Sequence, residues 1–420
     1  MARRLIALVP SEAVRPRMAG IGIRYLEMAR RLTEFGFRTV LLTPGDPSDV
    51  PELPDHSEVR KFEQGRIGEI LGDCDVVVTQ GQLANDVVLE LGDKPVAVDF
   101  YDPFLVENFS YAKTLGLDPY RNDHATWLLQ LSRGDFFLCS SEEQRQFYLG
   151  FLTALGRVNP ENLEQDPDLR SLIGIVPFGV PRELPTHEPY LDLPKDGEKR
   201  LLFGGLYDWY DPWPVLSALE QNRHLGWSLL LIRNPNPGTP QKLFSEVETW
   251  CRRRNMWENE VKILDWVPGA RRYDLLRDVD LMVATHRLSL ETRLSLRTRF
   301  LDALSAGCPV VTSEGGAMSR LLREYDAGWV VPEGDGEAVS KAFQEILSDP
   351  ELVARRRQGG YDLLTAYSWE QALDPLIQFC NDPKVDETKT LFCHQLATQA
   401  PADPTMFRIR RKLKRWLKRG

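Results

Sequence analysis

Short runs of apolar residues alternate along the chain with longer segments in which apolar residues recur every three or four positions. A short apolar run predicts a buried strand, and the wider spacing predicts a helix with one face on a core. The segment 23–35 predicts such a helix, because its apolar positions form one stripe. In the first half of the chain we expect strands at 5–9, 39–43, 76–79, 95–99, 136–139 and 173–176.

The same alternation begins again near residue 200. Strands that alternate with helices predict a parallel sheet covered by helices on both faces. The chain is therefore expected to be an α/β protein with two Rossmann-like domains that face each other across a cleft, where ligands bind at the carboxyl ends of the strands. In this second half we expect helices at 300–306 and 338–347, and strands at 200–203, 228–232, 261–264, 281–284, 309–312 and 328–331.

The stretch 177–199 separates the two patterns. It contains five prolines and many charged residues, which is typical of a linker. We therefore place the first domain at 1–180, the linker at 181–199 and the second domain at 200–366. A length of 420 residues agrees with two domains.

Composition narrows the class of protein. A hydrophobic content of 42% and no apolar run long enough to span a membrane predict a soluble, cytoplasmic protein. The six cysteines form no C-x-x-C pair, which favours reduced thiols over disulfides or a zinc site. The net charge is −9, and residues 406–420 alone carry +8, so residues 1–405 carry −17. Such an acidic body argues against nucleic-acid binding.

A glycine loop precedes the first predicted helix. Gly20 and Gly22 would let the backbone approach a ligand closely, and a helix N-terminus favours an anion. Tyr25 stands where a dinucleotide-binding loop needs a third glycine. The alternative is a glycine turn that only leads into the helix and binds no ligand.

A second candidate lies in the second half, where the doubly basic segment 291–299 enters a helix directly after a buried strand. Arginines and backbone amides at a helix start suit a diphosphate, and a carboxylate one turn further along suits sugar or ribose hydroxyls. The alternative is a solvated arginine-rich face. The candidate binding residues in this segment are Glu291, Arg297, Thr298, Arg299 and Asp302.

Two acids follow a predicted strand of the first domain. Asp99 or Asp102 could accept a proton or stabilise positive charge on a reacting group, and the alternative for Asp99 is a helix cap. His124 and His286 are further candidates. Three D-x-D triplets, at 73–75, 166–168 and 278–280, could in principle hold a metal, but two of them open buried strands. We expect all three to be structural, and no metal or other cofactor to be required.

Several motifs together resemble family 4 retaining glycosyltransferases of the GT-B fold. They are the helix end Asp302-Ala-Leu-Ser-Ala-Gly-Cys-Pro-Val-Val-Thr, the later Ala327-Gly328-Trp-Val-Val-Pro-Glu-Gly-Asp335, Val176-Pro-Phe-Gly-Val180 at the domain junction, and Gly204-Gly205 opening the second domain. The resemblance covers about residues 3–380. It implies a nucleoside diphosphate sugar as donor, held mainly by the second domain, an acceptor held by the first, transfer with retention of configuration, and a crossover helix at 367–383 that packs back on the first domain.

The chain departs from this family at the donor site. The family holds the donor with two glutamates eight residues apart, and here Asp302 stands at the second position and Leu294 at the first. Glu291 could replace the missing carboxylate. Gly205 is expected to contact the donor, but the family's Arg and Lys after these glycines are absent. Two other hypotheses are therefore a degenerate subunit that only binds a sugar nucleotide, and a non-hydrolysing sugar-nucleotide epimerase.

Residues 384–420 are predicted to form a tail with a basic amphipathic helix at 406–420. Its apolar residues fall on one helical face and its basic residues surround them, which is the pattern of a helix that lies on a membrane surface. The alternative is a disordered basic tail. If the helix binds a membrane, the protein is peripheral on the inner face of the cytoplasmic membrane, and a glycan or lipid-linked acceptor is expected. The apolar residues are Met406, Ile409, Leu413, Trp416 and Leu417.

Overall fold

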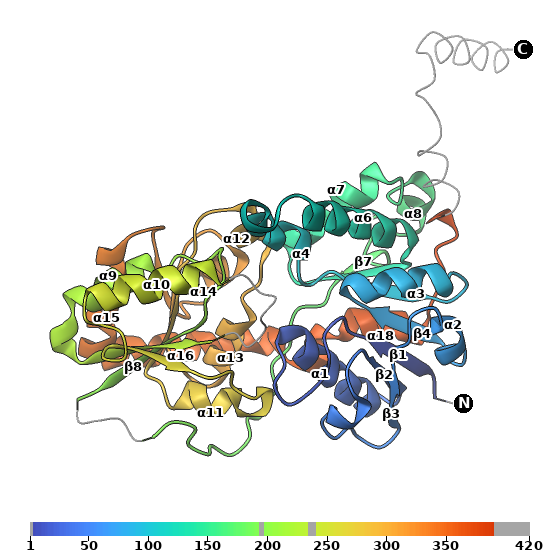
Figure 1. The fold of residues 1–420 in the computed structure, drawn as a ribbon. Coiled ribbons are helices and arrows are strands. Elements are labelled where there is room, and N and C mark those ends of the chain that lie inside the picture. The colour runs from blue at the N-terminus through green and yellow to red at the C-terminus, as the bar shows by residue number, and fades with distance from the viewer. Residues whose placement is uncertain (1–2, 193–196, 234–240, 390–420) are drawn as a thin grey trace, which may run out of the picture.

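The computed structural model describes residues 3–192, 197–233 and 241–389 and contains two parallel β-sheets, one in each half of the chain (Figure 1). The first sheet has seven strands in the order β3-β2-β1-β4-β5-β6-β7. The second has six in the order β10-β9-β8-β11-β12-β13. The prediction of a two-domain α/β protein is thereby confirmed.

Every predicted strand is present, with bounds that differ by two residues at most. Among the residues that the structure describes, the pattern missed one strand, β3 Ser57–Lys61, which lies at the sheet edge and has only half-buried or exposed residues. The other strands of the first sheet are β1 Leu5–Val9, β2 Arg38–Thr43, β4 Val76–Thr79, β5 Val96–Asp99, β6 Phe136–Cys139 and β7 Ile173–Ile175. Those of the second are β8 Lys199–Gly205, β9 Trp227–Ile232, β10 Val261–Leu264, β11 Leu281–Ala284, β12 Val310–Ser313 and β13 Trp329–Val331.

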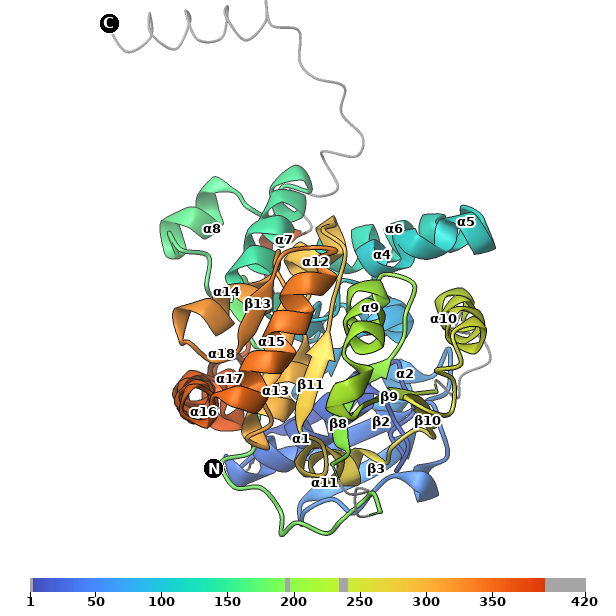
Figure 2. The same cartoon turned by 90° about the vertical axis from the view of Figure 1, so that its left-hand side faces the viewer.

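Helices cover both faces of each sheet. In the second domain α10 lies above the sheet and α11 below it in the view of Figure 1, while Figure 2 shows this domain in front. The helices of the first domain are α1 Gly20–Glu34, α2 Ile67–Ile70, α3 Ala84–Glu90, α4 Phe104–Glu107, α5 Ala112–Leu115, α6 Asp118–Arg133, α7 Glu142–Ala154 and α8 Pro160–Gln165. The second has α9 Trp213–Gln221, α10 Lys242–Arg253, α11 Arg272–Arg277, α12 Leu290–Leu294, α13 Thr298–Ser305, α14 Ala317–Glu324, α15 Gly336–Ser348 and α16 Pro350–Leu364.

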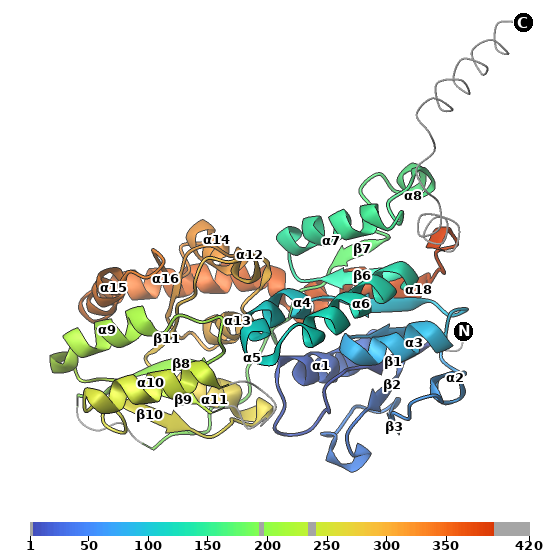
Figure 3. The ribbon, with the colours of Figure 1, turned by 45° about the horizontal axis from the view of Figure 1, so that its top comes forward.

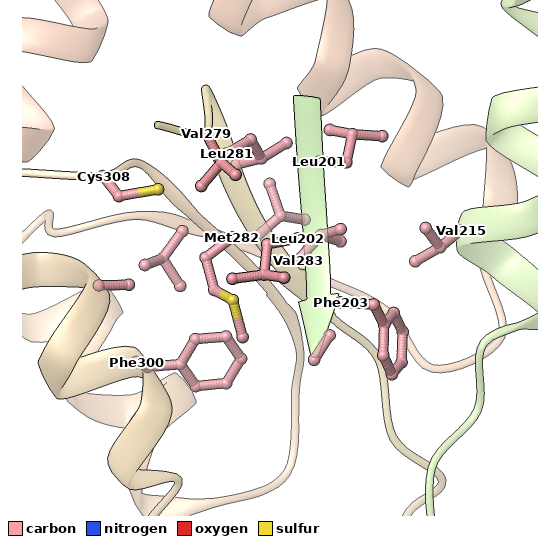
Figure 4. Close-up of a cluster of buried hydrophobic side chains, with 14 of the residues drawn as sticks. Leu201, Leu202, Phe203, Val215, Val279, Leu281, Met282, Val283, Phe300 and Cys308 are labelled. Carbon is pink, nitrogen blue, oxygen red and sulfur yellow. The ribbon is translucent and has the colours of Figure 1, made fainter. Parts of the chain in front are cut away.

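The two faces of each strand contribute side chains to different parts of the core. In β1, residues 5, 7 and 9 belong to one apolar cluster, and Ile6 and Leu8 to the cluster on the opposite face. This alternation follows from the two-residue repeat of a strand. The second domain has one large core, in which side chains of β8 and β11 meet Phe300 of α13 (Figure 4).

The chain passes from one domain to the other twice, near Val180 and near Tyr367, and these two segments are hydrogen-bonded to each other. Val180 donates its N–H to the carbonyl of Tyr367 at 2.8 Å, and Trp369 donates to the carbonyl of Val180 at 3.1 Å. A Cβ on Gly179 would lie 2.4 Å from Cδ2 of Trp369, so only glycine permits this approach. The crossings therefore form one connected hinge.

After the second crossing, the chain returns to the first domain. Helices α17 Trp369–Ala372 and α18 Asp374–Asn381 contribute Trp369 and Leu376 to the same cluster as Ile6. Beyond them Asp386 pairs with buried Arg157 at 2.6 Å, and Lys389 pairs with buried Asp135 at 2.7 Å. The first part of the predicted tail is thus packed on the first domain, and the predicted membrane helix at 406–420 lies outside the described residues.

Candidate active site between the two domains

Two adjoining cavities lie between the domains, at the carboxyl ends of central strands of both sheets. We call them the apolar cavity, of about 230 Å³, and the polar cavity, of about 250 Å³. Because the carboxyl ends of parallel strands are where open α/β sheets bind ligands, these cavities are the candidate site. Residues of both domains line each cavity, and those shared by the two are Ala19, Gly20, Tyr207, Thr298 and Arg299.

The apolar cavity contains one carboxylate among mainly apolar walls that include Met18, Phe178 and Trp266. This carboxylate is Asp302 in the second turn of α13, and it accepts hydrogen bonds from the Tyr273 hydroxyl at 2.8 Å and from Arg272 Nε at 3.3 Å. Burial and the nearby Asp302 charge raise the pKa of Tyr273 well above its usual value, so its hydroxyl stays a donor. The cavity thus offers a fixed acceptor inside an apolar pocket.

The polar cavity has aromatic and charged walls. The rings of Tyr207 and Trp209 stack with centroids 4.8 Å apart and planes at 6°, and Trp209 meets Tyr111 of the first domain edge-on at 5.8 Å. Two arginines, Arg297 and Arg299, line the same cavity. Aromatic faces beside arginines suit a ligand that carries both a sugar ring and negative charge.

Arg299 is held by main-chain carbonyls instead of a carboxylate. Its Nη1 donates to the carbonyl of Phe203 at 3.1 Å and to that of Gly205 at 3.4 Å. Gly204 has φ +82°, and a Cβ there would lie 3.0 Å from Arg299 Nη1. The predicted donor residues Gly205, Thr298 and Arg299 are thus brought together, and the charge of Arg299 is left for a ligand.

Glu291 does not line either cavity, and the prediction that it replaces the family's first carboxylate is not supported by its placement. Its side chain is buried and pairs with Arg297 Nη2 at 2.7 Å, while it accepts from the Ser295 hydroxyl at 2.9 Å. Because both oxygens are used within the protein, Glu291 orients Arg297 and does not face a ligand.

Leu294, at the family's first carboxylate position, packs on the first domain. It is only 4% exposed and belongs to the apolar cluster of that domain, together with Phe100 and Leu105. Helix α12, which carries it, lies beside α4 in Figures 1 and 3. The position that holds the donor in the family therefore contributes to packing between the domains here.

The glycine loop behaves differently from the prediction. Gly20 lines both cavities, but Gly22 lines neither, because its position is filled by Met18, with Sδ 2.8 Å from where a Cβ would lie. The amides of Ala19 and Gly22 donate to the carboxylate of Glu12 at 2.6 and 2.8 Å. The anion at the N-terminus of α1 is therefore a side chain of the protein itself.

Asp99 is also placed differently from the prediction that it is catalytic. Its carboxylate accepts from Arg24 Nε at 2.7 Å and Arg24 Nη2 at 3.1 Å, and both side chains have no exposed surface. Arg24 also donates to the carbonyls of Val176 and Pro177, both at 2.8 Å. Asp99 is therefore a buried structural partner that a substrate cannot contact.

Asp102 lines the polar cavity, as the sequence predicts for a catalytic carboxylate, and it has a neighbour that the sequence did not indicate. This neighbour is Glu107, at the end of α4, which lines the same cavity. Burial is the main cause that raises the pKa of both groups, and it raises that of Glu107 well above its usual value. The cavity thus contains a carboxyl pair.

The other sequence candidates lie outside the two cavities. Burial lowers the pKa of His286 well below its usual value, so its ring is neutral, and it lines neither cavity. Asp75 and Asp280 accept the amides of Leu5 and Arg200 at 2.8 and 2.9 Å, which are equivalent structural roles in the two halves. Across the described ranges, no cluster of three or more His, Cys, Asp or Glu is arranged to hold a metal ion, and none of the helices is long and apolar enough to cross a membrane.

Residues 215–349 match the sequence model of the family described as Glycosyl transferases group 1. A stretch of 69 residues, 16% of this chain, is 35% identical to a phosphatidyl-myo-inositol mannosyltransferase of Mycobacterium leprae strain TN. A stretch of 109 residues, 26% of this chain, is 30% identical to the enzyme of that name from Mycolicibacterium smegmatis. The matches span 18% and 27% of those two proteins.

Solved structures resemble nearly the whole chain. Sucrose-phosphate synthase from Thermosynechococcus elongatus has a TM-score of 0.64 at 17% identity, over 90% of this chain and 98% of its own. Anabaena Alr3699/HepE in complex with UDP-glucose has a TM-score of 0.61 at 14% identity, over 90% of this chain and 100% of its own. At such identities these likenesses establish the fold, which is GT-B, and the predicted resemblance to glycosyltransferases of this fold is confirmed.

Proposed function

We propose that this chain is a glycosyltransferase that moves a hexose from a nucleoside diphosphate sugar to a glycan or lipid-linked acceptor, with retention of configuration and without a metal ion. The observation that carries the proposal is the pair of adjoining cavities. One is apolar with a fixed carboxylate, which suits a nucleoside. The other has arginines, aromatic faces and a carboxyl pair, which suits a diphosphate and a sugar.

The chain supplies the groups that such a transfer needs. Asp302, oriented by Tyr273 and Arg272, would accept hydrogen bonds from the ribose hydroxyls. Arg297 and Arg299 would stabilise the negative charge that develops on the leaving diphosphate, because they are already held in place before the donor arrives.

The relatives support this donor class. HepE was solved with UDP-glucose, and the mycobacterial relatives are named as mannosyltransferases of phosphatidyl-myo-inositol. An acceptor in a membrane fits the basic residues at 406–420, which would hold the protein on an anionic surface as a peripheral protein.

Thermal shift with UDP-, GDP-, ADP- and dTDP-linked sugars in metal-free buffer tests the donor site. A ligand that binds only the folded state raises the melting temperature. We expect one nucleotide class to stabilise the wild type, and Asp302→Ala and Arg299→Lys to lose that stabilisation. Arg357→Ala is the matched control, because Arg357 lies on α16 and lines a different cavity.

If no sugar nucleotide stabilises the protein at millimolar concentration, the proposal fails. The buried position of Leu294 and the ion pair of Glu291 with Arg297 favour one other function, a subunit that binds a sugar nucleotide without turnover. That function predicts the same thermal shifts but no release of nucleoside diphosphate in the presence of any acceptor.

A further inference from the structure

The residues that line the two cavities follow one order across the cleft. Asp302 lines only the apolar cavity, while Tyr207 and Arg299 line both cavities. Trp209 and Arg297 line only the polar cavity. A sugar nucleotide has the same linear order, with a nucleoside at one end, a diphosphate in the middle and a sugar at the other end. A donor with its ribose at Asp302 and its diphosphate at Arg299 therefore brings its sugar to the part of the polar cavity that Trp209 lines.

Trp209 belongs to an aromatic wall on the loop that follows β8. Its ring stacks on that of Tyr207, with centroids 4.8 Å apart and planes at 6°. Tyr111 of the first domain meets the ring of Trp209 edge-on at 5.8 Å, so both domains hold this ring in place. Tyr207 and Trp209 are half-buried and line the cavity. A ring that is already fixed loses little conformational freedom when a ligand packs against it.

The indole N–H of Trp209 takes no part in holding the ring. Its Nε1 atom is buried and has no hydrogen-bond partner among the residues that the structure describes. The position of the ring thus depends on its contacts with Tyr207 and Tyr111. A phenylalanine at this position can form the same kind of contact.

The first domain supplies polar groups to the same cavity. Asp102 and Glu107 line it together with Trp209. A hexose has hydroxyl groups around its rim and C–H bonds on the faces of its ring. Its hydroxyls can therefore bond to the carboxyl groups while one C–H face packs on the aromatic surface, where no hydroxyl loses its hydrogen bonds.

We propose that Trp209 is a specificity-determining residue for the sugar of the donor: its ring packs on a C–H face of the transferred hexose and so distinguishes the sugar nucleotide from the free nucleoside diphosphate. The inference rests on the proposed function, since it assigns the sugar subsite of the same cleft. The loop at 206–212, between β8 and α9, contains no arginine or lysine. Arg297 and Arg299 at the start of α13 supply the charge for the diphosphate instead, and the loop contributes aromatic surface for the sugar.

Calorimetric titration with matched pairs of ligands tests this role. Each pair is a free nucleoside diphosphate and a sugar nucleotide: UDP with UDP-glucose, GDP with GDP-mannose, ADP with ADP-glucose, and dTDP with dTDP-glucose. For the pair that the wild type binds, we compare the Kd of the sugar nucleotide with that of the free diphosphate. Trp209→Ala should raise this ratio about tenfold, because only the sugar loses a contact. Trp209→Phe should stay within about threefold of the wild type, because it keeps an aromatic ring.

Trp213→Ala is the matched control. Trp213 is another half-buried tryptophan of the second domain, but its ring packs near that of Trp250, with centroids 6.2 Å apart, and it lines neither cavity. This variant should leave the ratio unchanged. Both ligands of a pair are measured on the same protein, so a variant that lowers the amount of folded protein does not alter the ratio.

A ratio that Trp209→Ala leaves unchanged overturns the inference, whether neither ligand of the pair is weakened or both are weakened equally. A ratio that Trp209→Phe raises as much as Trp209→Ala also overturns it, because the aromatic ring would then not be the group that matters. Failure of the proposed function looks different, since the wild type itself would then bind none of the sugar nucleotides, and both proposals would fall together.

Discussion

The buried ion pair between Arg24 and Asp99 permits a sharp test of the assignment of Asp99 as structural. Asp99→Ala removes a carboxylate that accepts two charge-assisted hydrogen bonds, at 2.7 and 3.1 Å. The guanidinium of Arg24 keeps its hydrogen bonds to the carbonyls of Val176 and Pro177. Its positive charge, however, loses the carboxylate that compensates it and stays fully buried.

The expected cost follows from this geometry. Breaking a buried pair by removing one partner costs about 3–5 kcal/mol, because an uncompensated charge stays buried. Replacing both partners, as in Arg24→Met with Asp99→Leu, should recover most of that loss, because no charge then needs compensation. Asp118→Ala breaks an exposed pair with Arg121 and should cost less than about 1 kcal/mol.

Urea unfolding followed by hydrogen exchange in peptides of β1 and β5 measures the free energy of unfolding of the first domain separately from the second. A loss below about 1 kcal/mol for Asp99→Ala, or a double variant no more stable than the single one, would refute the reasoning. If Asp99 were instead a catalytic group, Asp99→Asn would abolish turnover with the free energy of unfolding nearly unchanged.

Three further predictions concern packing and charge. Leu294→Ala should lower the free energy of unfolding by about 2–5 kcal/mol in urea titrations, because Leu294 is buried in the cluster of the first domain. Leu294→Glu should weaken the binding of sugar nucleotides measured by calorimetry. Tighter binding by that variant would contradict the packing role of Leu294. His286 is neutral when folded, so the unfolded state alone gains a proton as the pH falls below about 6.5, and stability should fall by up to about 1.4 kcal/mol per pH unit. His286→Gln should flatten that slope, and an unchanged slope would assign it to other groups. Gly179→Ala should lower the melting temperature and increase exchange at Trp369, because the added methyl would overlap its ring, and an unchanged melting temperature would show that the hinge can shift.

The strands were predictable because they are buried and apolar, and the order of helices and strands then determined two parallel sheets. The strand β3 was missed because Ser57, Glu58, Arg60 and Lys61 are polar, so the edge strand has no apolar run. Thr298, Arg299 and Asp302 were predictable as cavity residues because the segment after a buried parallel strand lies at the carboxyl end of the sheet, although the short helix α12 intervenes between β11 and α13.

The residues that the sequence analysis placed wrongly or missed have partners far along the chain or on another element. Asp99 follows a strand as a catalytic acid would, but Arg24 lies 75 positions away and pairs with it. Glu107 was missed because Ser295, which donates a hydrogen bond to it, lies 188 positions away and meets it only when the domains pack. Arg272 and Tyr273 precede Asp302 by about 30 positions, and no local pattern indicates their contact.

The return of the chain to the first domain has a consequence for biosynthesis. Ribosomes synthesise a protein from its N-terminal side, and domains generally fold in the order in which they emerge. Here the first domain is completed by Trp369 and Leu373 and by the ion pairs of Asp386 and Lys389, which are made after the whole second domain. Until those residues emerge, Arg157 and Asp135 lack their partners and an apolar surface stays uncovered. The nascent first domain therefore waits through the synthesis of the second, and a chain that stops early is exposed to chaperones and proteases with that surface open.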